Sequence, residues 1–310
     1  MSLVNQTIVQ QQAMPKSDIR GKWRSWLSYW IFLSPFTVMF LMFFFIPLIK
    51  GGWMSFTDST MDPSASFIGI KNYIDIFTND SNFFHSLWIT ILFTFPNVLL
   101  SNLIAILLAL AVESVQSKLK NVFRTLFFLP YIFALVVVGF TWKFIFIDAL
   151  PDLAEKLHLP FLNIDFLGVA SNAIYAIIIM NVWYTLGYFM VIYVAGLQGL
   201  DKSILESARM DGATGLTLFI KIILPLLMPA VTICVFTGCM SSFKIFDAVF
   251  VLTGGGPGYA TDLLSLNIYT NAFGEFKYGY GMAKAVTMAL VLFAVGFIQL
   301  KFFKEREVEA

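Results

Sequence analysis

Long uncharged apolar runs alternate with charged segments along the whole chain. No charged residue occurs between Arg24 and Lys50 or between His85 and Glu113. A membrane-spanning helix needs about 20 consecutive, mostly apolar residues. Each of these two runs is long enough, so we predict a spanning helix in both.

The same pattern predicts four further spans, which we place at about residues 125–143, within 166–200, at 222–243 and at 281–302. The last span carries Lys284 near one end and Lys301 near the other, where long cationic side chains can extend to the membrane interface. Pro130 can kink the third span. The expected fold class is an all-α membrane protein with six transmembrane helices.

Composition supports this fold class and excludes others. The chain has 310 residues, of which 58% are hydrophobic, 17% aromatic and only 13% charged. A soluble core of this size cannot bury so much apolar surface, so lipid must cover part of it. The net charge of +1, with no concentrated basic patch, argues against a nucleic-acid partner.

The positions of Lys and Arg predict the orientation in the membrane, because retained cytoplasmic segments are enriched in them. One side receives Lys16, Arg20, Lys22, Arg24, Lys118, Lys120, Arg124, Lys202, Arg209, Lys221, Lys301, Lys304 and Arg306. The other side receives fewer, spread over longer connections. We therefore expect a multi-pass membrane protein with both termini in the cytoplasm. Residues 1–25 are expected to be a disordered tail, 26–303 the membrane domain and 304–310 a second tail.

The connection at 201–225, between the fourth and fifth spans, is too long for a simple turn. Asp201 and Ser203 can cap a short helix at about 204–210. Gly212 permits a break, and a second helix can begin near Thr214. The small residues Ala208, Gly212 and Ala213 leave room for another surface to approach closely. We predict a structured cytoplasmic loop.

This loop resembles the signature of permease subunits in binding-protein-dependent ATP-binding-cassette (ABC) importers. The matching residues are Glu206, Ser207, Ala208, Gly212, Ile222, Leu224 and Pro225. Ser207 stands where alanine is usual. The resemblance implies the type I importer permease fold and a coupling helix seated in a cleft of the ATPase subunit. The docking residues would be Glu206, Ser207, Ala208, Arg209, Asp211, Gly212 and Ala213. The alternative is an amphipathic interfacial helix without a partner.

The resemblance covers about residues 26–307. Within the family, the chain is similar to the carbohydrate-import branch, the maltose-type permeases. Gly69, Asn72 and Tyr73 form one matching motif after the first span. A second lies in an outer loop, at Thr253, Gly254, Gly255, Gly256 and Pro257. This glycine run lacks the Lys-Ser/Thr ending of a phosphate-binding loop. It is either a turn imposed by Gly and Pro or a contact for the solute-binding protein, and both can hold.

Polar side chains in the fourth and fifth spans are the candidates for a solute path, because a polar group facing lipid is costly. The candidates are Asn181, Tyr184, Thr185, Tyr188, Ser241 and Ser242. The first four share one helical face. Hydroxyl, amide and aromatic groups suit a sugar, but interhelical packing is an equal alternative. Lys244 and Asp247 are three residues apart, so we expect them to form an ion pair.

The resemblance implies a non-enzymatic permease that forms half of the translocation path for a carbohydrate. The expected carbohydrate is an oligosaccharide. Its partners would be a second, different permease, two ATP-binding subunits that hold ATP and Mg, and an extracytoplasmic solute-binding protein. No cofactor is expected in this chain. The alternatives are an importer of glycerol phosphate or another polyol and an ion-coupled secondary transporter, although no ionisable residue lies at the middle of a span. A membrane enzyme is disfavoured because the spans hold no acid/base pair.

Overall fold

The structure is a computed structural model that describes residues 19–60, 65–115 and 117–305. The chain divides into two compact units, Met1–Trp53 and Met54–Ala310, and each is described by itself. Most of the tail expected at 1–25 lies outside the described residues. Helix α1 begins at Ile19, within that range. The described chain continues as helix to Lys304, and 306–310 again lie outside it.

The first unit is one apolar helical rod. It consists of α1 (Ile19–Phe40), the π-helical segment η1 (Leu41–Phe45) and α2 (Ile46–Met54), which ends just past the unit boundary. Residues Tyr29–Met54 are long and apolar enough to cross a membrane, with a mean hydropathy of 2.2. Their side chains are not buried by their own unit, so they are available to lipid or to another protein surface.

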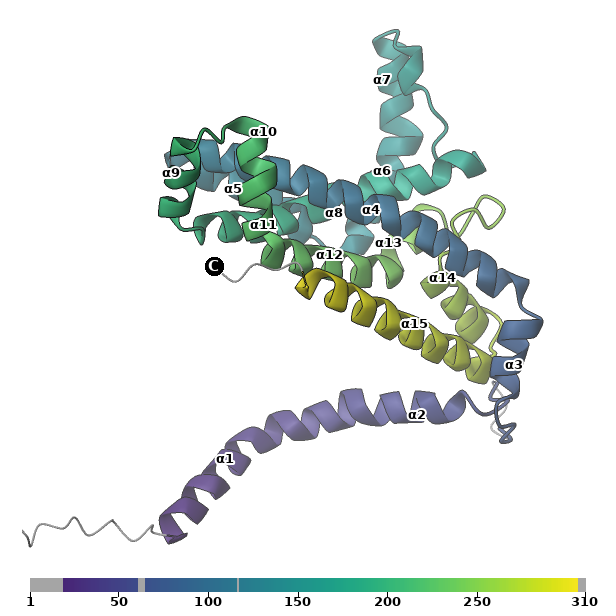
Figure 1. Ribbon diagram of the computed structural model, residues 1–310. Coiled ribbons are helices and arrows are strands. Elements are labelled where there is room, and N and C mark those ends of the chain that lie inside the picture. The colour runs from purple at the N-terminus through teal and green to yellow at the C-terminus, as the bar shows by residue number, and fades with distance from the viewer. Residues whose placement is uncertain (1–18, 61–64, 116, 306–310) are drawn as a thin grey trace, which may run out of the picture. The chain divides into compact units, whose positions relative to one another are not determined.

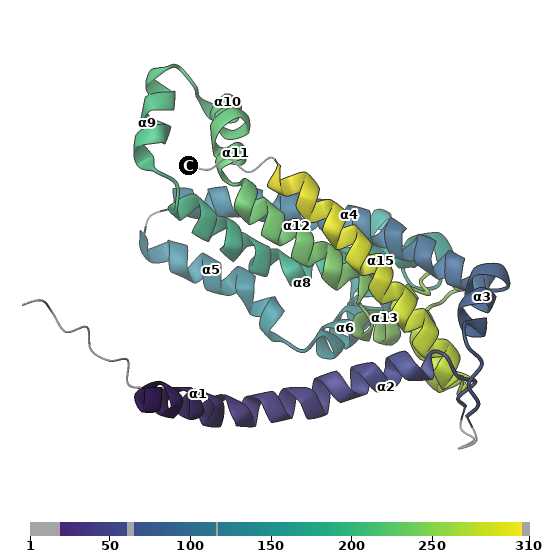
Figure 2. The same cartoon turned by 60° about the horizontal axis from the view of Figure 1, so that its bottom comes forward.

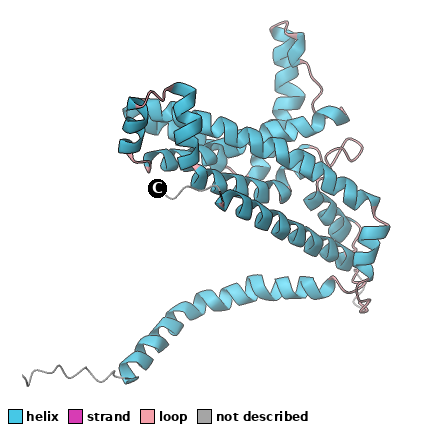
Figure 3. Cartoon of the chain, in the orientation of Figure 1, coloured by secondary structure: helices cyan, strands magenta, loops and turns pink. Residues whose placement is uncertain are grey.

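The second unit is built of helices, and among the described residues it contains only an isolated β-bridge between Thr57 and Phe67 in addition (Figure 3). Its α-helices are α3 (Lys71–Thr78), α4 (Ser81–Ser114), α5 (Ser117–Ile132), α6 (Leu135–Phe144), α7 (Leu150–Lys156), α8 (Ala170–Gln198), α9 (Lys202–Met210), α10 (Gly215–Leu218), α11 (Leu224–Leu226), α12 (Met228–Phe243), α13 (Asp247–Leu252), α14 (Leu264–Tyr269) and α15 (Tyr278–Lys304). Short 3₁₀ or π segments are η2 (Ile145–Ala149), η3 (Pro160–Leu162), η4 (Phe219–Ile223) and η5 (Thr270–Gly274).

The six predicted spans are found if each of two bent helix pairs counts as one span. The second, fourth and sixth spans correspond to α4, α8 and α15, whereas the third and fifth are not the single helices that the sequence predicts. The third bends by 94° between Ile132 and Leu135, and the fifth by 73° between Leu226 and Met228.

Proline explains both bends, because it cannot donate a backbone hydrogen bond and its ring clashes with the preceding turn. Pro130 lies inside α5 just before the first bend, and Ala134 there takes an extended conformation. Pro225 and Pro229 flank the second bend at Leu227.

Helix α8 is the centre of the second unit. It contacts α4 on one side and α5 on another, and α12 also packs on α4 (Figures 1 and 2). In the apolar window of α8, 61% of the residues are buried, against 11% in α15. Gly187 allows the close approach of α5, because a Cβ atom there would lie 1.9 Å from the carbonyl oxygen of Phe127. The outer helix α15 leaves most of its apolar surface for lipid or another subunit.

Candidate functional site

The loop at 201–225 folds as two short helical arms at one end of the second unit (Figure 2). Helix α9 begins at Lys202, and the Asp201 carboxylate accepts a hydrogen bond from the Ser203 N–H at 2.8 Å. That backbone bond, with one from the Ser203 side chain, holds the pKa of Asp201 below its ordinary value. The capped helix of the prediction is therefore present, with Asp201 as its cap.

Helix α9 ends in a Schellman motif, in which a residue of positive φ reverses the chain. The N–H of Ala213 bonds to the carbonyl of Ala208 at 2.9 Å, and that of Gly212 to Arg209 at 3.0 Å. Gly212 has φ of +86°, a conformation that costs other residues about 1 kcal/mol or more. The second arm then begins at Gly215, one residue after Thr214. Local chemistry alone accounts for this turn.

The loop presents polar side chains outward, but one candidate docking residue faces inward. Glu206, Ser207, Arg209, Asp211 and Gly212 are exposed, and Ala213 is partly exposed. Ala208 is buried, so its side chain adds little to the outer surface of the loop. Helix α9 contacts η4 of the second arm.

Met210 is a surface residue that the sequence analysis missed. It is 88% exposed at the end of α9. The available signal was an apolar side chain between Arg209 and Asp211 next to a glycine turn. An exposed methionine at the tip of a loop can pack against another protein, because its flexible side chain adapts to different surfaces.

A cavity of about 230 Å³ opens where both the α5/α6 bend and the α12/α13 junction meet α8. Five of the six candidate solute-path residues line it, namely Asn181, Tyr184, Thr185, Tyr188 and Ser241. Tyr131, Leu135, Phe189, Thr237, Lys244, Ile245, Phe246 and Asp247 complete the wall. The structure thus brings together residues of the third, fourth and fifth spans around one hollow.

Ser242 does not line this cavity. It is 1% exposed and belongs to a chain of amide hydrogen bonds behind the wall. The Asn181 amide donates to Asn97 at 3.1 Å, and the Asn97 amide donates to the Ser242 hydroxyl at 2.9 Å. Asn97 lies on α4 and was not among the candidates. One indication of its role was present in the sequence, namely that Asn97 is a polar residue directly after Pro96 in the second predicted span.

Packing accounts for part of the predicted polar face. Asn181 and Thr185 are only 6% and 8% exposed, and the Thr185 hydroxyl donates to the Asn181 carbonyl at 2.9 Å. The Tyr184 hydroxyl donates to the carbonyl oxygens of Tyr131 and Phe133 at 3.4 and 3.3 Å. These two carbonyls lie at the α5/α6 bend, so Tyr184 stabilises the bend while its ring faces the cavity.

An aromatic wall remains available to a solute. The rings of Tyr131 and Tyr188 stack with centroids 4.6 Å apart at 14°, and Tyr184 lies 5.1 Å from Tyr131. Tyr131 was also missed by the sequence analysis, because it lies on a different span and shows no periodicity with the others. Stacked rings and nearby hydroxyls are groups that hold the apolar face and the hydroxyls of a sugar.

The expected ion pair between Lys244 and Asp247 is wrong. Within residues 19–60, 65–115 and 117–305, no ion pair within 4.0 Å joins them. Helix α12 ends at Phe243 and α13 begins at Asp247. Because the helix breaks between the two residues, the neighbouring positions of a continuous helix do not apply. Both side chains are exposed and line the cavity.

The outer glycine loop is built by its own hydrogen bonds. The Thr261 hydroxyl donates to Thr253 Oγ1 and to the Gly256 carbonyl, both at 2.8 Å. Gly254 and Gly255 have φ of +58° and +90°, and the Gly256–Pro257 peptide is cis. Gly254 is exposed and Gly255 is buried, whereas Thr253, Gly256 and Pro257 are partly exposed. The sequence therefore folds here as a defined turn with an accessible edge.

The motif after the first span has a structural role in the second unit. The Asn72 amide donates to the carbonyl oxygens of Ser55 and Thr57 at 2.9 and 2.8 Å. The Tyr73 and Ser55 hydroxyls are 2.7 Å apart, and Gly69 has φ of +62°. These contacts fasten the start of the unit to α3.

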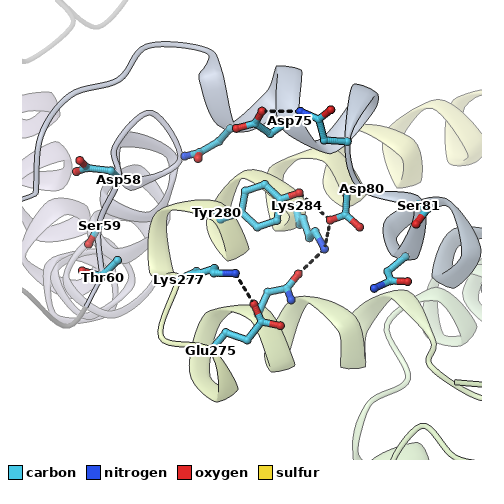
Figure 4. A pocket seen from close by; sticks show the side chains of 14 residues that line it. Asp58, Ser59, Thr60, Asp75, Asp80, Ser81, Glu275, Lys277, Tyr280 and Lys284 are labelled. Carbon is cyan, nitrogen blue, oxygen red and sulfur yellow. Dashed lines mark hydrogen bonds and ion pairs between the residues drawn. The ribbon is translucent and has the colours of Figure 1, made fainter. Parts of the chain in front are cut away.

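A second, polar pocket of about 500 Å³ lies at the end of the unit opposite α9 (Figures 1 and 4). Lys284 lies at its base, only 1% exposed, so it does not extend to the membrane interface as expected. Its ammonium lies 2.6 Å from Asp80 and donates to Asn267 at 2.7 Å. A cation inside a helical unit requires such partners.

The Asp80 carboxylate is the main partner of this lysine. Burial raises its pKa, but hydrogen bonds from Lys284, Tyr280 and the Phe83 N–H outweigh burial and hold the pKa below its ordinary value. Asp80 also caps α4 by accepting from the Phe83 N–H at 2.8 Å. The pair therefore ties the start of α4 to α15.

The fold, the two-armed loop and the span pattern define a class of membrane transport subunit. Residues 101–306 match the family described as the binding-protein-dependent transport system inner membrane component, and the chain belongs to that family. It is a permease subunit of an ABC importer, as the signature loop predicts.

Curated relatives and a solved structure agree with this assignment. The chain is 33% identical over 281 residues to a probable starch degradation products transport system permease of Thermoanaerobacterium thermosulfurigenes, covering 91% of this chain and 95% of the relative. It is 31% identical to a multiple sugar-binding transport system permease of Streptococcus mutans, over 90% and 96% of the two chains. The fold is similar to a chain of a bacterial alginate ABC transporter in complex with an alginate pentasaccharide-bound periplasmic protein. The TM-score is 0.77 at 22% identity, covering 90% of this chain and 94% of that one.

Proposed function

We propose that this chain forms half of the translocation path for a neutral carbohydrate. The solute that we propose is an oligosaccharide. The observation that carries the proposal is the cavity at the two helix junctions, with its stacked Tyr131–Tyr188 wall and the Ser241 and Thr237 hydroxyls. The two curated relatives are named for starch products and multiple sugars, which supports the same solute class.

The importer would operate with partner chains. Two ATP-binding subunits would bind ATP and Mg and hydrolyse ATP, and a second, different permease would complete the path. The exposed face of α9 would seat in the ATPase subunit, with Met210 next to the polar residues of the signature. The two arms are joined by a compact turn, so a movement of the ATPase could be passed to the fifth span and open the cavity alternately to either side.

The accessible edge of the outer loop at 253–257 would contact an extracytoplasmic solute-binding protein. It lies toward the opposite end of the second unit from α9 (Figure 1). In this proposal the solute-binding protein lies outside and the ATPase inside. The excess of Lys and Arg on the side of α9 supports a cytoplasmic location for both termini of a bacterial or archaeal membrane protein.

The docking proposal is tested by ATP-dependent maltotriose uptake into membrane vesicles that contain the complete importer. Glu206→Trp and Gly212→Trp should each lower uptake at least about tenfold, because a docking contact is commonly worth 1–2 kcal/mol or more. Leu157→Trp, an equally bulky change at a residue of the outer connection that is 55% exposed, is the control and should transport normally. Unchanged uptake in both loop variants would refute the docking role.

The solute-path proposal is tested in the same vesicles. Tyr188→Ala removes one ring of the aromatic stack and should raise the maltotriose concentration needed for half-maximal uptake, or lower the maximal rate, by about tenfold. Tyr175→Ala removes a tyrosine that is 59% exposed on the same helix and should have no such effect. Equal transport by the two variants would contradict the assignment of the cavity.

A further inference from the structure

Two oppositely charged side chains face the cavity at the junction of α12 and α13. Lys244 and Asp247 are the charged members of the cavity wall, whose other residues are apolar, aromatic, hydroxyl or amide side chains. Both are exposed to the cavity side rather than buried among other polar groups. Their position therefore needs an explanation other than packing.

The helix break keeps the two charges from neutralising each other. The chain leaves α12 after Phe243 and re-enters a helix at Asp247, and Phe246 between them has φ of −127°. In the part of the chain that the structure describes, neither residue has an ion-pair partner within 4.0 Å. Charged side chains in a membrane protein are costly unless they pair or line a watery path, and there they commonly mark function.

The surrounding groups indicate what these charges contact. The Tyr131–Tyr188 stack and the ring of Tyr184 line the same cavity. A carboxylate accepts hydrogen bonds at two oxygens, and an ammonium group donates up to three. Neighbouring hydroxyl groups of a sugar donate and accept at the same time, so one solute can satisfy both charges.

We propose that Lys244 and Asp247 are solute contacts that select an uncharged, hydroxyl-rich solute. Asp247 accepts hydrogen bonds from sugar hydroxyls, Lys244 donates to sugar oxygens, and the tyrosine wall covers the apolar ring face. A phosphate group near Lys244 would also approach Asp247, so repulsion by the Asp247 carboxylate disfavours phosphorylated solutes. This inference rests on the proposed carbohydrate path and names its solute class.

The first experiment compares maltotriose uptake by vesicles containing wild-type importer with uptake by Lys244→Met and Asp247→Asn variants. Each variant should lose at least about tenfold in maximal rate, as for loss of a hydrogen bond to a charged group. ATP hydrolysis stimulated by the loaded solute-binding protein should stay within about twofold of wild type, which shows that the complex is assembled. Wild-type rates of uptake in both variants would overturn the inference.

Matched controls lie on α7, where the same chemical changes can be made away from the cavity. Lys156→Met and Asp152→Asn alter exposed residues and should leave uptake unchanged. If wild-type vesicles fail to take up maltotriose with ATP, the proposed function fails. If wild-type uptake is normal and all four variants match it, only the charged contact fails.

A charge exchange separates solute binding from a structural ion pair. The double variant Lys244→Asp with Asp247→Lys keeps both charges, so it would restore uptake if the residues only attracted each other. Direct contacts require the donor and the acceptor at their own positions, and uptake should remain at least about tenfold below wild type. Full restoration by the exchange would overturn the proposal.

Solute class is tested on the full chain in lipid nanodiscs by saturation-transfer difference NMR. Maltotriose should give a signal with the wild type that falls at least about tenfold in Lys244→Met and Asp247→Asn. An equal concentration of sn-glycerol 3-phosphate should not displace it. Displacement by the phosphate ester, or an undiminished signal in both variants, would overturn the selection of an uncharged solute.

Discussion

The loop at 201–225 and the cavity are built in two different ways. The loop at 201–225 is continuous in sequence, and the bonds that shape it join residues within about one helical turn, such as Ala213 with Ala208. The cavity draws its wall from three spans, and the bond from Asn97 to Ser242 behind it joins residues 145 positions apart. One region depends on local chemistry, the other on the whole fold.

This difference predicts how substitutions should act. Changes at the cavity remove contacts that hold several helices together, so they should lower the global stability of the chain. Changes in the loop should leave global stability nearly intact and alter transport, because a local segment can unfold by itself. The following four experiments test this contrast, in order of decreasing expected effect on stability.

The largest effect is expected for Gly187→Ala, next to the cavity. A Cβ atom would lie 1.9 Å from the Phe127 carbonyl oxygen, so α5 and α8 would have to separate. The expected cost is about 3 kcal/mol or more, at the upper end of overpacking effects because backbone atoms clash. Thermal unfolding of the purified chain measures it. Gly199→Ala is the control, since its nearest atom lies at 3.5 Å; equal stability of the two variants would show that the helices are not in such close contact.

Asn97→Ala should have the next largest effect. The change removes the amide that bonds to both Asn181 and Ser242. These two buried side chains would lose their partner, and each buried polar group left unsatisfied costs about 1–3 kcal/mol. The Asn97→Ala and Ser242→Ala effects on unfolding should be less than additive, because both break the same bond. Asn163→Ala, at an exposed residue of the connection before α8, should cost under about 0.5 kcal/mol. If the effects of Asn97→Ala and Ser242→Ala on the free energy of unfolding were strictly additive, the proposed chain of amide hydrogen bonds would be wrong.

Acid should weaken the fold through Asp80, to a smaller extent. Since the pKa of Asp80 is lowered in the folded chain, its contribution to stability is present above the ordinary aspartate range and is lost as the pH falls below about 4. The melting temperature of wild type should therefore fall from pH 5 to pH 3. The dependence of the melting temperature on pH should be weaker in Asp80→Asn, because the asparagine side chain does not titrate.

Asp201 provides a comparison from the loop for this pH dependence. Its pKa is also lowered, but by the neighbouring Ser203 at a fully exposed site. Asp201→Asn should keep the pH slope of wild type, because only the start of α9 depends on Asp201. An equal loss of slope in the two variants would remove the distinction between the loop and the packed helices that the Asp80–Lys284 pair joins.

Gly212→Ala should have the smallest effect on global unfolding. Alanine at φ of +86° strains the turn by about 1 kcal/mol, but that strain can be relieved within the loop. We expect the melting temperature to stay within about 2 °C while ATP-dependent uptake falls severalfold. Lys202→Ala, at the exposed start of α9, should leave both unchanged. A large drop in melting temperature for Gly212→Ala would show that the loop is part of the global fold.

Some features followed from sequence because their causes are local. The apolar runs predicted six spans, and Asp201 and Gly212 predicted where α9 begins and ends. Each depends on residue type and short spacing: a span must satisfy its own backbone, and a helix end must be capped. The same reasoning predicted polar residues on one face of α8, although it left their partners undefined.

Only the tertiary structure decided which of these features meet. It placed Tyr131 against Tyr188, buried Ala208 and Ser242, and drew Lys284 inward to Asp80 instead of outward to the interface. It also broke the chain between Lys244 and Asp247, so that both face a cavity where sequence spacing predicted an ion pair. Spacing along one helix cannot show contacts between spans, because these depend on where the helices bend and how closely their backbones approach. The sequence by itself determined the transport class and the turn of the loop at 201–225, and packing determined the shape and charge of the cavity.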